Sequence, residues 1–180
     1  MLKSKIIFFI IMISLFSSNI NASYEKLAFD FSFKDLDGSE MRLADFKDKV
    51  MVVTNVASYC GFTSQYEDLE KLHLKYDNLE VIGLPCNQFL FQEPFSEKKI
   101  QHFCQTNYSI SFILTQKIKV KGKNQHELYK WLTSKSLNGE KNSRVTWNFQ
   151  KYLIDKNGNF INYFSPKITP LSIEITNHLD

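Results

Sequence analysis

The chain of 180 residues has room for about one domain, because single domains typically span about 150 residues. Hydrophobic residues make up 43% of the chain and charged residues 23%, which is ordinary globular usage and excludes long disordered, collagen-like or coiled-coil segments. A formal net charge of +3 is too small to indicate nucleic-acid binding, and three cysteines are too few for a disulfide-stabilised scaffold. The composition therefore predicts a globular domain with a substantial hydrophobic core.

The first 22 residues differ in composition from the rest of the chain. Lys3 and Lys5 precede an apolar run over 6–16 that only Ser14 interrupts, and mostly polar and small residues follow as far as Ala22. This layout is typical of a secretory signal peptide, whereas a membrane-spanning helix needs about 20 apolar residues. We therefore expect residues 1–22 to be a signal peptide cleaved after Ala22, and we expect no stable membrane anchor. The mature domain, residues 23–180, is then nearly neutral and exported to the periplasm or beyond, where conditions are oxidising.

The first half of the mature domain alternates between strand and helix patterns. Apolar residues at every second position from Phe29 lead into a turn over 35–38, which predicts an N-terminal hairpin. A continuous run of mostly β-branched residues then predicts a strand buried on both faces. In chain order we expect this hairpin, a strand over 50–56, a helix over 62–76, a second buried strand over 79–84 and a helix capped by Ser96.

The second half predicts a helix, a hairpin and a final helix. Asn157 and Gly158 stand between two apolar runs, and an Asn-Gly pair is a strong hairpin signal. The strand-helix-strand order implies a parallel pair at the centre of the sheet. The elements expected here are a helix over 125–134, strands over 149–154 and 160–164, and a helix over 171–179. Together they predict an α/β domain of three layers with a central mixed sheet.

Cys60 is the residue that most clearly suggests chemistry. It follows the strand predicted over 50–56 and stands at the opening of the next helix, where free backbone N–H groups and the helix dipole favour a thiolate. Gly61 leaves the approach to the sulfur open. Position alone supports a reactive thiolate and an inert buried thiol equally. No cysteine stands three residues away, so the segment is not a Cys-x-x-Cys motif, and the four histidines show no pattern of a catalytic triad.

Three segments resemble the signature blocks of the glutathione peroxidase family. They read NVASYCG over 55–61, LPCNQF over 84–89 followed by QEP over 92–94, and WNFQKYL over 147–153. The likeness extends from Tyr24 to the C-terminus and implies a thioredoxin-like fold. It also implies that Cys60 is the peroxidatic residue and that Gln92, Trp147 and Asn148 complete a catalytic tetrad. Their N–H groups would donate hydrogen bonds to the thiolate and to the leaving oxygen.

The resemblance also assigns the other two cysteines. Cys104 matches the resolving cysteine of the two-cysteine members that use thioredoxin, and Cys86 matches a structural position. Because Cys104 falls on the inward stripe of its predicted helix, a Cys60–Cys104 disulfide is expected to require part of that helix to unravel.

The implied function is a thiol peroxidase acting in the oxidative stress response. It would reduce hydrogen peroxide and organic or lipid hydroperoxides through a sulfenic acid and then a disulfide, with a thioredoxin-like protein or glutathione as reductant and no metal or other cofactor. Trp131 and Trp147 are too close in sequence for the insertion that tetrameric members use at a subunit interface, so we expect a monomer with an open site. The alternative is a peroxide-sensing relay module that passes its oxidation to a partner protein.

Two positions depart from the family pattern. Leu90 stands where the family usually has glycine, so a left-handed backbone there would be strained. Ile113 replaces the proline that commonly follows the phenylalanine in the matching segment. Neither position carries a reacting group.

Overall fold

The structure, a computed structural model, describes residues 26–179, so the expected signal peptide lies outside the described residues. The strands are β1 (Ser32–Lys34), β2 (Glu40–Arg42), β3 (Val50–Val56), β4 (Leu79–Pro85), β5 (Ile113–Leu114), β6 (Lys151–Ile154) and β7 (Phe160–Phe164). The helices are α1 (Gln65–Lys75), α2 (Glu97–Tyr108), α3 (Glu127–Thr133), α4 (Lys135–Asn138) and α5 (Ile173–Thr176), with 3-10 turns at Ala28–Asp30 and Leu43–Phe46. None of the described helices is long and apolar enough to cross a membrane.

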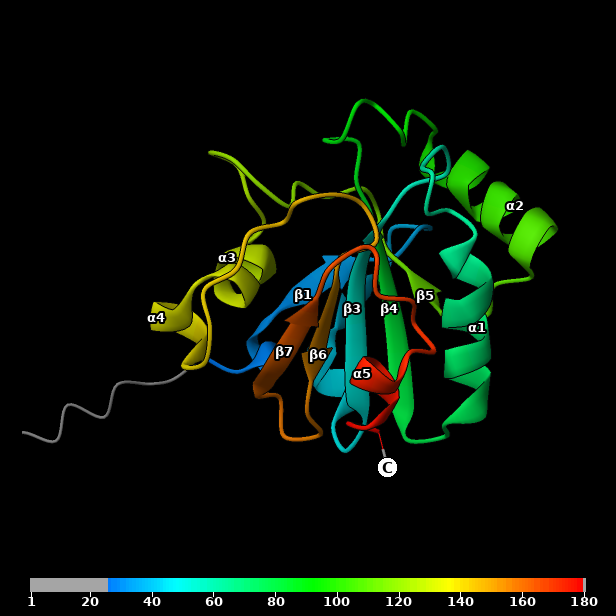
Figure 1. Cartoon of the computed structure of the whole chain (residues 1–180). Helices are drawn as coiled ribbons and strands as arrows, with labels where there is room; N and C mark the ends of the chain where they lie inside the picture. Colours follow the sequence, from blue (N-terminus) through cyan, green and yellow to red (C-terminus); the bar gives the residue numbers. More distant parts are fainter. Residues whose placement is uncertain (1–25, 180) are drawn as a thin grey trace, which may run out of the picture.

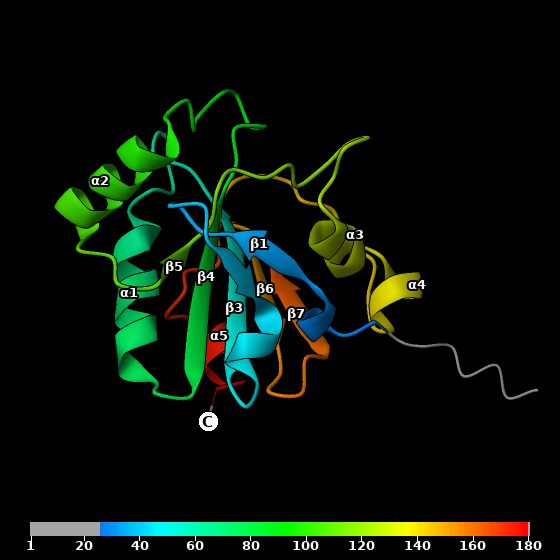
Figure 2. The ribbon, with the colours of Figure 1, turned by 180° about the vertical axis from the view of Figure 1, so that it is seen from behind.

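A five-stranded mixed sheet lies at the centre, in the order β5-β4-β3-β6-β7 (Figure 1). Strands β3 and β4 pair in parallel, as the sequence predicts, and β6 pairs antiparallel with both β3 and β7. The N-terminal hairpin β1-β2 forms a separate two-stranded sheet, which Figure 2 shows from behind.

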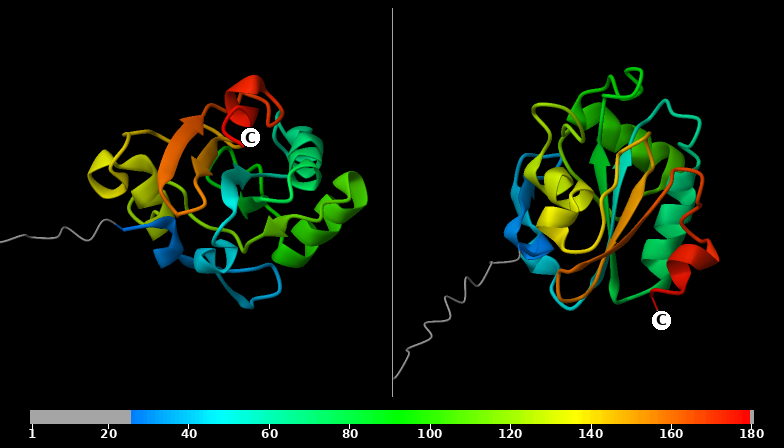
Figure 3. Two further views of the ribbon diagram at one scale, coloured as in Figure 1. Left: turned by 90° about the horizontal axis from the view of Figure 1, so that it is seen from below. Right: turned by 60° about the vertical axis from the view of Figure 1, so that its left-hand side comes forward.

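Two apolar clusters cover the two faces of this sheet. In β3, Met51 and Val53 belong to one cluster and Val52 to the other, because successive side chains of a strand point to opposite faces. The first cluster takes in the hairpin and α3, and the second takes in α1, α2 and α5. Figure 3 shows the sheet between these two layers, which is the predicted three-layer arrangement.

The differences from the predicted elements lie mainly at helix ends. The helix predicted from 62 begins at Gln65, because the backbone just before it forms tight turns in which Thr63 and Gln65 donate to Cys60 and Phe62. The helix predicted over 171–179 shrinks to α5, since Ile173 at its start is 65% exposed and contributes nothing to an apolar stripe. Phe29 lies in a 3-10 turn rather than in the hairpin strand. Strand β5 and helix α4 are too short to show a periodicity and were not predicted.

Lys151 is a fully buried lysine in the middle of this fold. Its ammonium donates to the carbonyl oxygens of Pro166 and Ile168 at 3.3 and 2.5 Å, which ties the segment after β7 to β6. Burial lowers the pKa of Lys151 from 10.5 to about 7. The wild-type fold therefore carries a cost for the buried charge at neutral pH.

We expect Lys151→Met to change how stability depends on pH. Below about pH 7 the lysine is protonated in both the folded and the unfolded chain, so the full cost of burying the charge is present. Between about pH 7 and 10.5 only the unfolded chain keeps the proton, so wild-type stability gains about 1.4 kcal/mol per pH unit from this group. Urea unfolding at pH 7, 8 and 9 should show the advantage of the methionine variant shrinking as the pH rises. Lys156→Met, at an exposed turn, is the control, and a constant difference for Lys151→Met would contradict the prediction.

Candidate active site

Cys60 lies in the turn between β3 and α1, at the carboxyl end of β3. The Cys60 N–H donates to the hydroxyl of Thr63 at 2.9 Å, and that hydroxyl lies 2.9 Å from the carbonyl oxygen of Ala57. The Cys60 sulfur accepts a hydrogen bond from the backbone N–H of Phe62 at 3.4 Å. The sequence placed Cys60 at the opening of a helix, but α1 begins five residues later. The sulfur therefore accepts from one backbone N–H of the turn. The free N–H groups at the start of a helix, which the sequence predicted beside it, belong to residues further along the chain.

There is open space beside Gly61, the residue that follows Cys60. The Cys60 residue is only 8% exposed, yet a Cβ added at Gly61 would meet no atom within 4 Å. The preceding residue, Tyr59, is 60% exposed. A small molecule can therefore come close to the turn without moving the core.

Gln92 and Asn148 come together from distant parts of the chain. The Asn148 Nδ2 donates to the Gln92 Oε1 at 3.0 Å, and Asn148 is fully buried. The backbone N–H of Tyr59 donates to the carbonyl oxygen of Gln92 at 3.0 Å. The loop that carries Gln92 is thus fastened directly beside Cys60.

Trp147 and Asn148 are held at the same end of the sheet by Asn55. This residue of β3 donates from Nδ2 to the carbonyl oxygen of Trp147 at 3.1 Å, and its own carbonyl accepts from Phe149 N–H at 2.6 Å. Phe149 has a left-handed φ of 64°, so the chain bends sharply after Asn148 and the strand predicted from 149 begins at Lys151. The Trp147 ring packs on Phe89, with 5.5 Å between ring centroids.

Glu93 is a buried carboxylate beside these residues whose contacts the sequence did not reveal. Its Oε2 accepts from the N–H and hydroxyl of Ser58 at 2.9 and 3.0 Å, and its own N–H donates to Asn87 Oδ1 at 2.9 Å. Burial raises the pKa of Glu93, against the hydrogen bonds from Ser58. Glu93 therefore joins the Gln92 loop to the start of the Cys60 turn. The sequence offered one signal for Glu93, which is that this carboxylate directly follows the predicted site residue Gln92.

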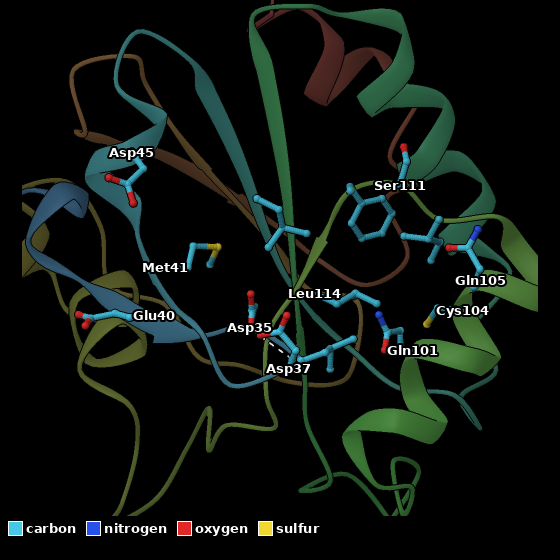
Figure 4. Close-up of a pocket in the computed structure, with 14 residues that line it drawn as sticks. Asp35, Asp37, Glu40, Met41, Asp45, Gln101, Cys104, Gln105, Ser111 and Leu114 are labelled. Carbon is cyan, nitrogen blue, oxygen red and sulfur yellow. Dashed lines mark hydrogen bonds between the residues drawn. The ribbon is translucent and has the colours of Figure 1, made fainter.

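Cys104 lies on α2, buried, with a free thiol. It belongs to the same apolar cluster as Cys60, and burial raises the pKa of Cys104 to about 12. It also lines a cavity of about 510 Å³ between the hairpin, α2 and β5 (Figure 4). The other lining residues include the acidic side chains Asp35, Asp37, Glu40 and Asp45, but none of Cys60, Gln92, Trp147 and Asn148.

Cys86 also has a free, buried thiol, but it belongs to the cluster on the other face of the sheet. Burial raises the pKa of the Cys86 thiol, which disfavours the reactive thiolate. In the described part of the chain, no group of three or more histidine, cysteine, aspartate or glutamate side chains is placed to hold a metal ion.

A thiol at the carboxyl end of a central strand, in a mixed sheet covered by helices on both faces, defines a thioredoxin-fold thiol protein. The fold is shared with a thioredoxin family thiol:disulfide interchange protein from Chlorobium tepidum TLS, at a TM-score of 0.59 and 15% identity. That likeness covers 83% of this chain and 92% of the other. It confirms the predicted thioredoxin-like architecture.

Within that class, the chain belongs to the glutathione peroxidase family, as the sequence blocks predict. The family's sequence model matches residues 28–133. A glutathione peroxidase from Lactococcus lactis subsp. cremoris is 45% identical, over 81% of this chain and 94% of its own length. A glutathione peroxidase-like peroxiredoxin 2 from Saccharomyces cerevisiae is 40% identical, over 81% of this chain and 91% of its own. The crystal structure of T. cruzi GPX1 superposes with a TM-score of 0.66 at 28% identity, covering 86% of this chain and 94% of that one.

Proposed function

We propose that Cys60 is the peroxidatic residue of this thiol peroxidase. The observation that carries the proposal is the Cys60 turn, open at Gly61 and fastened to the Gln92–Asn148 pair, in a chain of the glutathione peroxidase family. The Cys60 thiolate attacks one peroxide oxygen, a sulfur–oxygen bond forms and the oxygen–oxygen bond breaks. The second oxygen takes up a proton and leaves as water or an alcohol, and Cys60 is left as a sulfenic acid. Membership of this family favours the enzyme over the relay module.

Gln92, Asn148 and Trp147 are the proposed donors to this reaction. Because Gln92 Oε1 accepts from Asn148, the Nε2 protons of Gln92 remain available to the thiolate and to the departing oxygen. Such donors favour a thiolate without adding a full positive charge and stabilise the charge that develops on the leaving oxygen. The tetrad then acts through prearranged hydrogen bonds.

Loss of the Gln92–Asn148 pair should slow the oxidation of Cys60. We expect Asn148→Ala and Gln92→Ala each to lower the second-order rate constant with hydrogen peroxide by about a hundredfold, as for the loss of one oxyanion donor. The double variant should lose less than the product of the two effects, because the residues share one hydrogen bond. Stopped-flow measurement of Cys60 oxidation gives the rates, with the exposed amide variant Asn177→Ala as control. Purely multiplicative effects would argue against a coupled pair.

We further propose that Cys104 resolves the sulfenic acid and that the resulting disulfide is reduced by a thioredoxin-like protein. The similarity to a relative that is itself called a peroxiredoxin supports this choice. An internal disulfide is reduced by a dithiol protein in one encounter, whereas glutathione needs two successive attacks. We also propose that residues 1–22 direct export, in which case this reductant must be an exported protein too. We also propose that the protein acts as a monomer, which leaves its site open to organic and lipid hydroperoxides.

Turnover should therefore depend strongly on the reductant. With hydrogen peroxide or cumene hydroperoxide as substrate, we expect thioredoxin and its reductase to support at least about tenfold faster turnover than glutathione at a matched thiol concentration. Consumption of NADPH, coupled through thioredoxin reductase or glutathione reductase, measures both rates on the exported form of the protein. Equal rates would reject the thioredoxin-like reductant, and activity confined to hydrogen peroxide would reject the open site.

A further inference from the structure

Leu90 and Phe91 form an apolar projection beside the candidate active site. They are 75% and 79% exposed, and their φ angles of 50° and 55° place both in the left-handed region. The sequence predicted this strain at Leu90, where the family usually has glycine. A left-handed backbone costs a non-glycine residue roughly 1 kcal/mol or more, and an exposed side chain returns nothing to folding. The fold alone therefore gives no reason for two bulky apolar side chains at this place.

This projection is continuous with the approach to Cys60. Gln92 follows Phe91 directly, and its carbonyl oxygen accepts from Tyr59 N–H at 3.0 Å. The exposed Tyr59 ring in turn contacts Phe95, with 5.1 Å between ring centroids. We call the exposed residues Tyr59, Leu90 and Phe91 the apolar rim.

A strongly basic loop is fastened beside this rim. Gln88 donates to the carbonyl oxygen of Lys121 at 2.9 Å and accepts from Val120 N–H at 2.7 Å. The Lys121 ammonium lies 3.9 Å from the centroid of the Phe89 ring. Figures 1 and 2 both show the loop after β4, which carries Leu90 and Phe91, and the loop over 117–123 at the same end of the molecule, beyond the carboxyl end of β4. Residues 117–123, here called the lysine loop, contain no acidic residue and four lysines: Lys117, Lys119, Lys121 and Lys123.

We propose that the apolar rim and the lysine loop together dock the candidate active site on an anionic lipid surface. Apolar side chains that enter the interface, flanked by lysines that meet anionic headgroups, are the combination by which proteins bind such membranes. Charge complementarity favours an anionic lipid surface as the occupant, because the lysine loop has four lysines and no acidic residue and lies at the same end of the molecule as the exposed Leu90 and Phe91. The inference rests on the proposed function: docking presents Cys60 to peroxidised acyl chains at the membrane surface.

Binding to lipid vesicles tests the proposal without any peroxide. We expect the full exported protein to sediment with phosphatidylcholine vesicles that contain phosphatidylglycerol, and at least about tenfold more weakly with phosphatidylcholine alone. Leu90→Asn with Phe91→Asn should weaken binding at least about tenfold, because two partly buried apolar side chains are lost. Asparagine tolerates the left-handed backbone, so the loop keeps its conformation. Replacing Lys119, Lys121 and Lys123 by glutamine should cost about fivefold for each lysine.

Matched controls lie away from this end of the molecule. Leu74→Asn removes a leucine that is 67% exposed on α1. Lys156→Gln removes an exposed lysine of the β6–β7 turn. Neither variant should change vesicle binding more than twofold. Absence of wild-type binding, equal binding to neutral vesicles, or unchanged binding of the Leu90/Phe91 variant would each overturn the proposal. If vesicles are not bound while turnover with thioredoxin falls in the Leu90/Phe91 variant, the surface accepts a protein and the proposal is wrong. Failure of the proposed function would show separately, as absence of hydrogen peroxide reduction in solution.

Discussion

Replacing Cys60 by serine should abolish peroxide reduction, lowering turnover by at least about a thousandfold while leaving the fold intact. The serine hydroxyl is close in size to the thiol, and the Cys60 N–H bond to Thr63 does not involve the side chain that is changed. A hydroxyl stays protonated at neutral pH and cannot form a sulfenic acid, so the attacking atom and its oxidised product are both lost. The loss is therefore chemical and needs no change of structure.

Two measurements identify the reacting cysteine. Peroxide consumption with a thioredoxin system reports turnover, and mass spectrometry after trapping with dimedone reports sulfenic acid on Cys60. Cys86→Ser is the matched control, because its thiol is buried in the cluster on the other face of the sheet. It should keep turnover within about threefold. If Cys60→Ser still reduces peroxide at a comparable rate, the assignment of Cys60 is wrong.

The regular elements of the fold could be predicted where the sequence carries a local pattern. The run over 50–56 and the Asn157-Gly158 turn predict β3 and the β6–β7 hairpin, because strand burial and turn geometry depend on neighbouring residues. The start of α1 could not be predicted in the same way. It depends on the hydrogen bonds of Thr63 within the turn, and the apolar pattern continues through residue 62 regardless.

The candidate site shows the same division between local and long-range information. The family blocks name Gln92 and Asn148, but their hydrogen bond joins residues 56 positions apart in sequence. The bond from Ser58 to Glu93 spans 35 positions, and no periodicity encodes such a contact. The strain at Leu90 is an exception, since the absence of glycine could be read at a single position and the structure has the left-handed φ there.

If Cys104 resolves the sulfenic acid as proposed, we expect part of α2 to unwind, because Cys104 is buried on this helix. Burial raises the pKa of Cys104 to about 12, so in the folded helix it is a thiol and a poor nucleophile. Only Ile100 and Cys104 of α2 are fully buried, and the N-cap Ser96 makes no side-chain capping bond. At the other end Ser109 has a left-handed φ of 51°. Two further residues of α2, Phe103 and Tyr108, pack only partly buried against the same cluster. We therefore expect α2 to open locally at lower cost than α1, which would expose Cys104 and restore an ordinary thiol pKa.

Cys104→Ser should therefore separate the two halves of the reaction. We expect Cys60 to form its sulfenic acid at a rate within about threefold of wild type, because Cys104 takes no part in that step. Turnover with thioredoxin should fall at least about a hundredfold, since no internal disulfide forms, and one peroxide is consumed per chain. Continued turnover at the wild-type rate would show another resolving route.

Hydrogen exchange gives an independent measure of the same step. In wild-type protein oxidised with one equivalent of peroxide, the amides of α2 should exchange at least about tenfold faster than in the reduced protein, because a disulfide requires the Cα atoms of Cys60 and Cys104 within about 7 Å. Cys104→Ser treated in the same way should keep the slow exchange of the reduced helix. The amides of α1, anchored by the fully buried Tyr66, Leu69 and Leu72, serve as an internal reference and should not change. Equal exchange of α2 before and after oxidation, with the disulfide present by mass spectrometry, would mean that the two cysteines pair without unwinding the helix.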